Sequence, residues 1–179
     1  METGEMQAIM EAIIYVADSP VKLEQFKEIF PEENPETIVQ ALKELMESFN
    51  ARRGGMLIRE VADGYRMTTR PEHHEQIRSY LKTRPSAKLS MAALETLAVI
   101  AYKQPVTMAE ILAIRGKKST TALQTLLERK LVAILGRKPV VGRPILYGTS
   151  KEFLIHFGLK NLTELPTLEE FAQIAGEQL

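Results

Sequence analysis

Several short motifs in this sequence contain the residue types of catalytic or nucleotide sites, but none has the complete pattern. Gly116-Lys117-Lys118-Ser119 resembles the end of a phosphate-binding loop, yet Ile111 occupies the position of the upstream glycine and no predicted strand precedes it. Ser79-Tyr80-Leu81-Lys82 has the Ser-x-x-Lys spacing, but the companion Ser-Asp-Asn and Lys-Thr-Gly segments are missing. We interpret Ser79–Lys82 as part of an ordinary helix, and Gly116 as the turn before the helix that starts at about 119.

Residues suited to metal binding and covalent catalysis are scarce. The chain has no cysteine, which excludes disulfides, thiolate nucleophiles and thiolate metal sites. His73 and His74 are neighbours at a predicted helix start, so their rings diverge, and His156 stands alone. We therefore expect no enzymatic activity, no cofactor and no metal, and a protein that works by binding other macromolecules.

A basic segment over residues 115–143 is the clearest chemical signal. Its eight Lys and Arg residues are accompanied by a single acid, Glu128, although the whole chain has a formal net charge of zero. The first 85 residues carry a net charge of −4, and the remaining residues carry +4. A positive patch of this kind attracts either phosphates or an acidic protein segment. The charge pattern leaves both classes of partner open.

The hydrophobic pattern predicts three helices, a hairpin and a closing helix in the first half. In chain order these are a helix at 6–17, a helix at 22–29, a helix starting at Asn34-Pro35, strands Met56–Val61 and Tyr65–Thr69, and a short helix. Asn34 is a favoured N-cap, and Pro35 suits the first helical position. Thr69-x-x-Glu72 has the spacing of a capping box for the closing helix.

The second half repeats the same order. It predicts helices at 90–102, 107–114 and about 119–130, strands Leu131–Leu135 and Ile145–Tyr147 around a basic loop, and a last short helix. Ser90 is the predicted N-cap of its first helix, and Thr107-x-x-Glu110 and Thr149-x-x-Glu152 are predicted capping boxes. The two halves align at an offset of 85, which places Pro20-Val21 on Pro105-Val106.

Helix, turn, helix, helix and hairpin is the order of a winged helix. We therefore predict a mainly α fold with small β wings: two tandem winged-helix (helix-turn-helix) domains joined by a short hinge at 83–88. The expected domains are residues 1–83 and 88–158, followed by a tail over 159–179 with a short helix. That helix begins at the capping box Thr167-x-x-Glu170 and either folds back on its own domain or docks onto a partner.

Composition agrees with a soluble chain in a reducing compartment. Apolar residues make up 45% and charged residues 26%, which is ordinary for a globular protein. The longest apolar stretch near the N-terminus, Ala12–Ala17, is far shorter than the ~20 residues of a membrane helix. Glu5 and Glu11 precede it, unlike the basic start of a secretory signal. We expect a cytoplasmic protein without a membrane segment.

DNA binding is the usual role of a helix-turn-helix, but the outward residues of the predicted recognition helices do not favour it. The first helix presents several acids, which would repel a duplex, and the second presents Thr121, Gln124, Thr125 and Glu128. Neither has an Arg or Asn placed to read base edges. We expect at most weak, non-specific DNA binding through the 115–143 segment, steeply lost with salt.

Five segments of the second half carry a specific resemblance. They are Leu89–Val106, Ile114–Gly116, Leu126–Arg129, Gly142–Thr149 and Phe157–Gly158-Leu159 with Leu165-Pro166. In this order they resemble the family of bacterial segregation and condensation protein B. The first half carries no comparable motif, although its size and order agree.

The resemblance implies a homodimer that binds the kleisin, segregation and condensation protein A. Through the kleisin it would join the SMC ATPase in the nucleoid-associated condensin complex that condenses and segregates chromosomes. In such proteins the N-terminal domain is associated with dimerisation and the C-terminal domain with the kleisin. The alternative from the fold alone is a winged-helix DNA-binding transcriptional regulator.

Three residues depart from the family pattern. Lys130 replaces the usual glycine after Glu128-Arg129, Val141 replaces proline before Gly142, and Lys117 replaces an apolar residue. If position 130 needs a positive φ, lysine there costs up to ~1 kcal/mol relative to glycine. Loss of the proline should loosen the wing.

Two groups of surface residues are the candidate contacts. For the kleisin they are Tyr102, Lys103, Gln104, Arg115, Arg137, Gly142, Arg143 and Tyr147. For dimerisation they are Ile9, Met10, Ile13, Tyr15 and Val16, because the first helix is apolar around more of its circumference than one core stripe needs. An equally good interpretation is that Gly142, Pro144 and Gly148 only shape the hairpin and that Tyr102 only packs within its domain.

Overall fold

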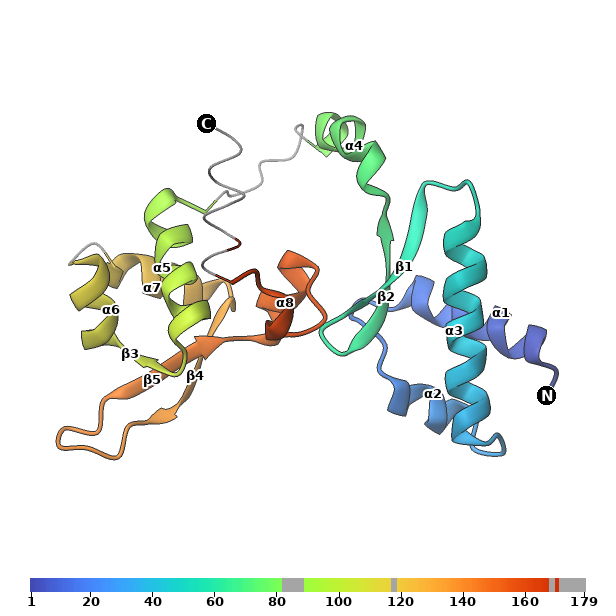
Figure 1. Ribbon diagram of the computed structural model, residues 1–179, viewed down its shortest axis with the longest axis horizontal. Coiled ribbons are helices and arrows are strands. Elements are labelled where there is room, and N and C mark those ends of the chain that lie inside the picture. The colour runs from blue at the N-terminus through green and yellow to red at the C-terminus, as the bar shows by residue number, and fades with distance from the viewer. Residues whose placement is uncertain (82–88, 117–118, 168–169, 171–179) are drawn as a thin grey trace. The chain divides into compact units, whose positions relative to one another are not determined.

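A computed structural model describes residues 1–81, 89–116, 119–167 and 170 of the chain (Figure 1). The chain divides into two compact units, Met1–Ser86 and Ala87–Leu179, each with its own hydrophobic core. The hinge predicted at 83–88 and most of the predicted tail helix lie outside the described residues. Among the described helices none is both long and apolar enough to span a bilayer.

The first unit contains three helices, a two-stranded hairpin and a closing helix. These are α1 (Thr3–Val16), α2 (Leu23–Ile29), α3 (Pro35–Ala51), β1 (Met56–Val61), β2 (Gly64–Thr69), the 3-10 turn η1 (Pro71–His73) and α4 (His74–Leu81). The strands pair antiparallel from Met56 opposite Thr69 to Val61 opposite Gly64. Ala62 and Asp63 connect them with φ angles of 51° and 55°, the two-residue turn whose twist matches that of a hairpin.

The core of the first unit lies between its three helices and the hairpin. Its largest fully buried side chains include Met6, Met10, Phe26, Ile38, Leu42, Leu45 and Ile58. The predicted cap of α3 is confirmed, because the Asn34 side chain accepts a hydrogen bond of 2.9 Å from the backbone N–H of Glu36. At the other end of α3, the Asn50 amide exchanges two hydrogen bonds with the backbone of Ile58, which ties the hairpin to the helix.

The second unit repeats this order and adds a third strand. Its elements are α5 (Met91–Lys103), β3 (Val106–Thr107), α6 (Met108–Arg115), α7 (Ser119–Glu128), β4 (Val132–Arg137), β5 (Ile145–Thr149), α8 (Lys151–Phe157) and the 3-10 turn η2 (Leu162–Glu164). The sheet order is β3-β5-β4, with both pairs antiparallel. The prediction of two tandem winged helices is confirmed, since each unit has three helices followed by a two-stranded wing (Figure 1).

The capping signals predicted for α5, α6 and α8 are correct in two of three cases. The Ser90 side chain accepts from the N–H of Ala93, and Thr107 and Glu110 form the predicted reciprocal capping box. The box at Thr149 is wrong, because Ser150 caps α8 by accepting from Phe153, while Thr149 is the last residue of β5. In the first unit the box at Thr69 and Glu72 is also wrong, since the helical turn there begins after Arg70.

The described part of the chain after α8 packs against the core of the second unit. Leu159 and Leu165 pack against its core, and the Tyr102 hydroxyl donates a 2.7 Å hydrogen bond to the carbonyl of Pro166. The start of the predicted tail, at 159–166, therefore folds back on its own domain. Thr167 and Glu170 make the two reciprocal hydrogen bonds of the predicted capping box, and these lower the pKa of Glu170.

Candidate functional site

The motifs that could carry chemistry do not form a site among the described residues. Ser79 to Leu81 lie on α4, Gly116 follows α6, and Lys82, Lys117 and Lys118 lie outside the described residues. Within the described part of the chain, no group of three or more His, Cys, Asp or Glu could hold a metal ion. The candidate sites are therefore surfaces, and the wing of the second unit is the most chemically distinct of them.

The β4–β5 loop is ordered by its own hydrogen bonds. The N–H of Lys138 donates to the carbonyl of Pro144, and that of Arg143 donates to the carbonyl of Val140, each over 2.9 Å. The Arg137 guanidinium donates to the carbonyl of Arg143 over 3.0 Å. Gly142 and Arg143 have φ angles of 83° and 39°, so the turn uses left-handed backbone at two consecutive residues. Despite valine at 141, this hydrogen bonding defines the shape of the wing.

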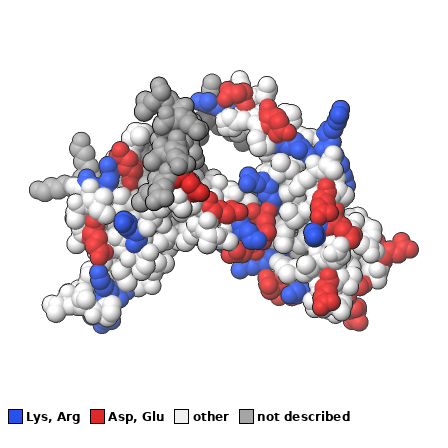
Figure 2. All heavy atoms as spheres, in the orientation of Figure 1, with Lys and Arg blue, Asp and Glu red and all other residues white. Residues whose placement is uncertain are grey.

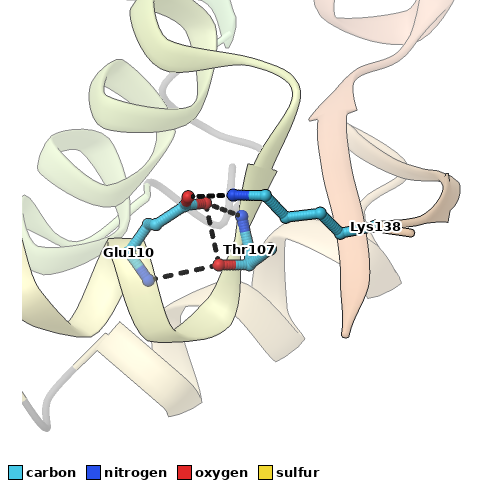
Figure 3. Close-up of polar contacts among 3 residues, drawn as sticks. All are labelled: Thr107, Glu110 and Lys138. Atoms are coloured by element: carbon cyan, nitrogen blue, oxygen red, sulfur yellow. Dashed lines mark hydrogen bonds and ion pairs between the residues drawn. The ribbon is translucent and has the colours of Figure 1, made fainter. Parts of the chain in front are cut away.

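An ion pair joins the start of the β4–β5 loop to the first turn of α6 (Figure 3). Lys138 Nζ lies 2.8 Å from one carboxylate oxygen of Glu110. The other oxygen accepts from the backbone N–H and the hydroxyl of Thr107, over 2.7 and 2.8 Å. These hydrogen bonds, first the one from Lys138 and then those from Thr107, lower the pKa of Glu110 to about 2. The carboxylate therefore stays charged and holds helix, strand and wing together.

The wing exposes apolar side chains next to its basic ones. Ile134 and Leu135 on β4 are 58% and 54% exposed, and Val141 at the tip is fully exposed. From Arg129 to Lys151 the chain has no Asp or Glu, while it contains six Lys or Arg residues. Figure 2 shows blue side chains beside uncharged surface at the lower left, where this hairpin lies. Exposed apolar surface with basic neighbours is typical of a site for another protein.

The structure separates the predicted kleisin residues into exposed and structural ones. Lys103, Arg137, Gly142 and Arg143 are exposed. Tyr102 and Tyr147 are partly buried, the first bonded to Pro166 and the second paired in the sheet and packed on the core.

Gln104 has a structural role that the sequence did not indicate. Its side-chain oxygen accepts from both the N–H and the hydroxyl of Thr149, and its side-chain nitrogen donates to the carbonyl of Ala101. A Cβ added at Gly148 would lie 2.5 Å from Leu135 Cδ1 and 2.7 Å from Gln104 Oε1, so glycine is needed there for close packing. Because its side-chain oxygen and nitrogen both make hydrogen bonds within its own domain, Gln104 is a poorer candidate contact than the exposed residues.

Arg115 is held at the end of α6 by an ion pair with Glu95 of α5. Its Nε has no hydrogen-bond partner within the described part of the chain, and the side chain is 26% exposed. A partner carboxylate would therefore have to compete with Glu95 for this guanidinium. Arg115 is a poorer candidate contact than Arg143, which is exposed on the wing.

The predicted dimerisation residues divide along α1. Tyr15 and Val16 are 70% and 73% exposed, whereas Ile9 and Ile13 are partly buried against the unit's own core. Met10 is fully buried, so it cannot contribute to a surface for a second copy, and this part of the prediction is corrected. Beside Tyr15 lies a groove of about 420 Å³, lined by Ala8, Glu11, Ala12, Tyr15, Phe49, Met56 and Met67.

Several outward polar side chains of the predicted recognition helices make hydrogen bonds within the chain. On α7 the Gln124 amide donates to Glu128, and the Thr125 hydroxyl donates to the carbonyl of Thr121. On α3 Glu44 accepts from Gln7 and Gln40. These polar groups are engaged within the chain, and the visible face of the first unit mixes acidic with basic side chains (Figure 2).

The proteins described below, to which this chain is similar, carry the same name. Segregation and condensation protein B of Syntrophotalea carbinolica is 48% identical over 178 residues, which are 99% of this chain and 89% of that protein. The protein of that name from Myxococcus xanthus is 42% identical over 99% of this chain, which spans only 53% of that longer relative. The crystal structure of ScpB from Mycobacterium tuberculosis has 31% identity, covers 89% of this chain and 98% of its own, and gives a TM-score of 0.43.

The family comparison covers nearly the whole chain. The family described as segregation and condensation complex subunit ScpB matches residues 8–168, which include both winged helices and the packed start of the tail. The family signal therefore extends over the first half, where no motif was recognised from the sequence. This chain belongs to the segregation and condensation complex subunit ScpB family.

Proposed function

We propose that this chain is a non-catalytic subunit of a bacterial SMC–kleisin complex, in which it supports chromosome condensation and segregation. It forms a homodimer through its first unit and binds the kleisin, segregation and condensation protein A, through its second. The main support is the wing of the second unit, where exposed apolar side chains lie beside arginines. The family to which the chain belongs is described as a subunit of a complex.

Dimerisation through the first unit is supported by the surface around the end of α1. Tyr15 and Val16 expose large apolar side chains beside an apolar groove. A two-fold axis would place the same patch of both copies in contact and remove it from water. Because Tyr15 and Val16 contribute nothing to the unit's buried core, their substitution should leave the fold intact.

Light scattering on the full chain tests this proposal. We expect the wild-type chain to have the mass of a dimer, and the double substitution Tyr15→Glu and Val16→Glu to give a monomer with an unchanged circular dichroism spectrum. Val39→Glu is the matched control, because Val39 is a 46% exposed apolar residue on α3 of the same unit. A double variant that remains a dimer would contradict this interface.

Kleisin binding through the second unit is supported by the charge and shape of the wing. Arg143 and Arg137 lie on the hairpin, and arginine binds carboxylates through paired, charge-assisted hydrogen bonds. The adjacent Val141 and Ile134 offer apolar contact. The partner segment is therefore mixed acidic and apolar in character.

Isothermal titration of the full chain with the full-length kleisin of the same organism tests this contact. Arg143→Glu should weaken binding by roughly 2–4 kcal/mol, because it replaces an attraction by a repulsion at a wing that supports no core. Lys22→Glu in the first unit is the control and should leave the affinity unchanged. Equal affinities of the wild type and Arg143→Glu would place the interface elsewhere.

A further inference from the structure

The sheet of the second unit has two outer strands, β3 and β4, and its central strand β5 extends beyond the short β3. Side chains close the outward backbone of β3 and this extension of β5. At β3, the outward N–H of Thr107 donates to the Glu110 carboxylate over 2.7 Å. At β5, where the short strand β3 ends, the N–H of Thr149 donates to the Gln104 side chain over 2.7 Å. Unpaired strand edges are templates for further strands, so closing them prevents pairing there.

The outer edge of β4 is different. This strand has six residues, Val132–Arg137, and lies at the end of the sheet order. Within the described part of the chain, the backbone of these residues bonds only to β5. The longest strand of the sheet is therefore the one whose second edge remains available to a partner.

The side chains of β4 are those of a contact surface. The register against β5 shifts between Ile134 and Gly136, which makes Leu135 the extra residue of a β-bulge. Ile134 and Leu135 are consecutive, and both are more than half exposed. Edge strands that avoid pairing usually carry charges at such positions, whereas here the first charged residue of β4 is Arg137, its last.

The charges around β4 indicate which kind of partner segment could pair with this strand. Arg129 and Lys130 precede the strand, and Arg137 ends it, with Arg143 on the returning side of the loop. No Asp or Glu occurs between Arg129 and Lys151. A second copy of β4 would bring like charges together at both ends, so an acidic partner is favoured over self-pairing.

We propose that the outer edge of β4 binds an extended partner segment as a fourth strand, with apolar side chains against Ile134 and Leu135 and carboxylates near the flanking arginines and lysines. This inference rests on the proposed function, because it specifies how the kleisin-binding wing holds its partner. Backbone hydrogen bonds supply affinity in this mode, and the alternating side chains supply selectivity.

Amide hydrogen exchange at single-residue resolution tests the proposal, with the full chain alone and bound to the full-length kleisin. We expect the fast-exchanging amides within residues 132–137 to slow by at least about tenfold in the complex, because they gain backbone acceptors. Ile134→Asp should weaken kleisin binding by at least about tenfold through lost apolar contact and added repulsion. Met91→Asp is the matched control, since Met91 is 70% exposed at the start of α5, where an acid suits the helix.

The outcomes separate the two proposals. If the kleisin binds and Arg143→Glu weakens it, but the β4 amides exchange as in the free chain, then strand addition is wrong and the proposed function stands. If the kleisin does not bind at all, both proposals fail. If β4 amides become protected in the chain alone as its concentration rises, the edge pairs with a second copy, and the acidic partner is wrong.

Discussion

Lys130 gives the sharpest test of the local energetics, because a lysine occupies a position built for glycine. The N–H of Leu131 donates to the carbonyl of Leu126, and that of Lys130 donates to Leu127, both over 2.9 Å. This pair of bonds ends α7 as a Schellman motif, whose penultimate residue adopts left-handed backbone. Lys130 does so with a φ of 58°. Leu126 and Leu131 are both buried, which fixes the turn from inside.

We expect Lys130→Gly to stabilise the second unit. Left-handed backbone costs a non-glycine residue about 1–2 kcal/mol, and Lys130→Gly removes this cost. The substitution also loses about 0.5–1 kcal/mol of stability, because glycine has greater conformational freedom in the unfolded chain. The net gain is therefore about 0.5–1 kcal/mol. For a unit of this size, that corresponds to a rise in Tm of roughly 2–8 °C.

Calorimetry and urea denaturation of the full chain measure this gain. Lys130→Ala is the control, because it removes the same exposed side chain while keeping the strained φ, and it should give no stabilisation. The reasoning would be refuted by a Lys130→Gly chain that is no more stable than Lys130→Ala. That result would mean that the turn accommodates a non-glycine residue at little cost in free energy, in spite of the buried leucines on either side.

Two further predictions concern the first core and the wing clamp. Phe26→Ala should destabilise the first unit by about 3–5 kcal/mol, because it leaves a cavity at a fully buried position; calorimetry should show the loss in that unit's transition alone. Glu110 has a depressed pKa of about 2, so its stabilising contribution is complete above its unfolded pKa, near ~4.3, and is lost as the pH falls toward 2. Urea denaturation from pH 6 to pH 2 should show a smaller fall in stability for Glu110→Gln than for the wild type, and equal falls would contradict the clamp.

Features set by short-range chemistry were predictable from the sequence. Asn34, Ser90 and Thr107 cap their helices as expected, because a capping side chain reaches a backbone N–H only two or three residues ahead. The two wings were also predictable, since each is a pair of neighbouring strands in the chain.

Features set by distant partners were missed. Strand β3 has two residues, and it exists because β5, some forty residues later, supplies its hydrogen bonds. The sequence predicts Thr149 as a helix cap, but its N–H and hydroxyl donate to the side chain of Gln104, just before the neighbouring strand β3. Ser150 caps α8 instead. The apolar pattern of α1 covers more than one face and therefore does not show that Met10 is buried, because only packing determines which face is buried.

The hydrogen bond between Tyr102 and Pro166 has a mechanical consequence. Residues 159–166 are fastened to the last turn of α5 by this bond, and Leu165 packs against the core of the second unit. A pulling force applied at Pro166 is therefore resisted by this hydrogen bond and by the packing of Leu165 before it fully loads α8.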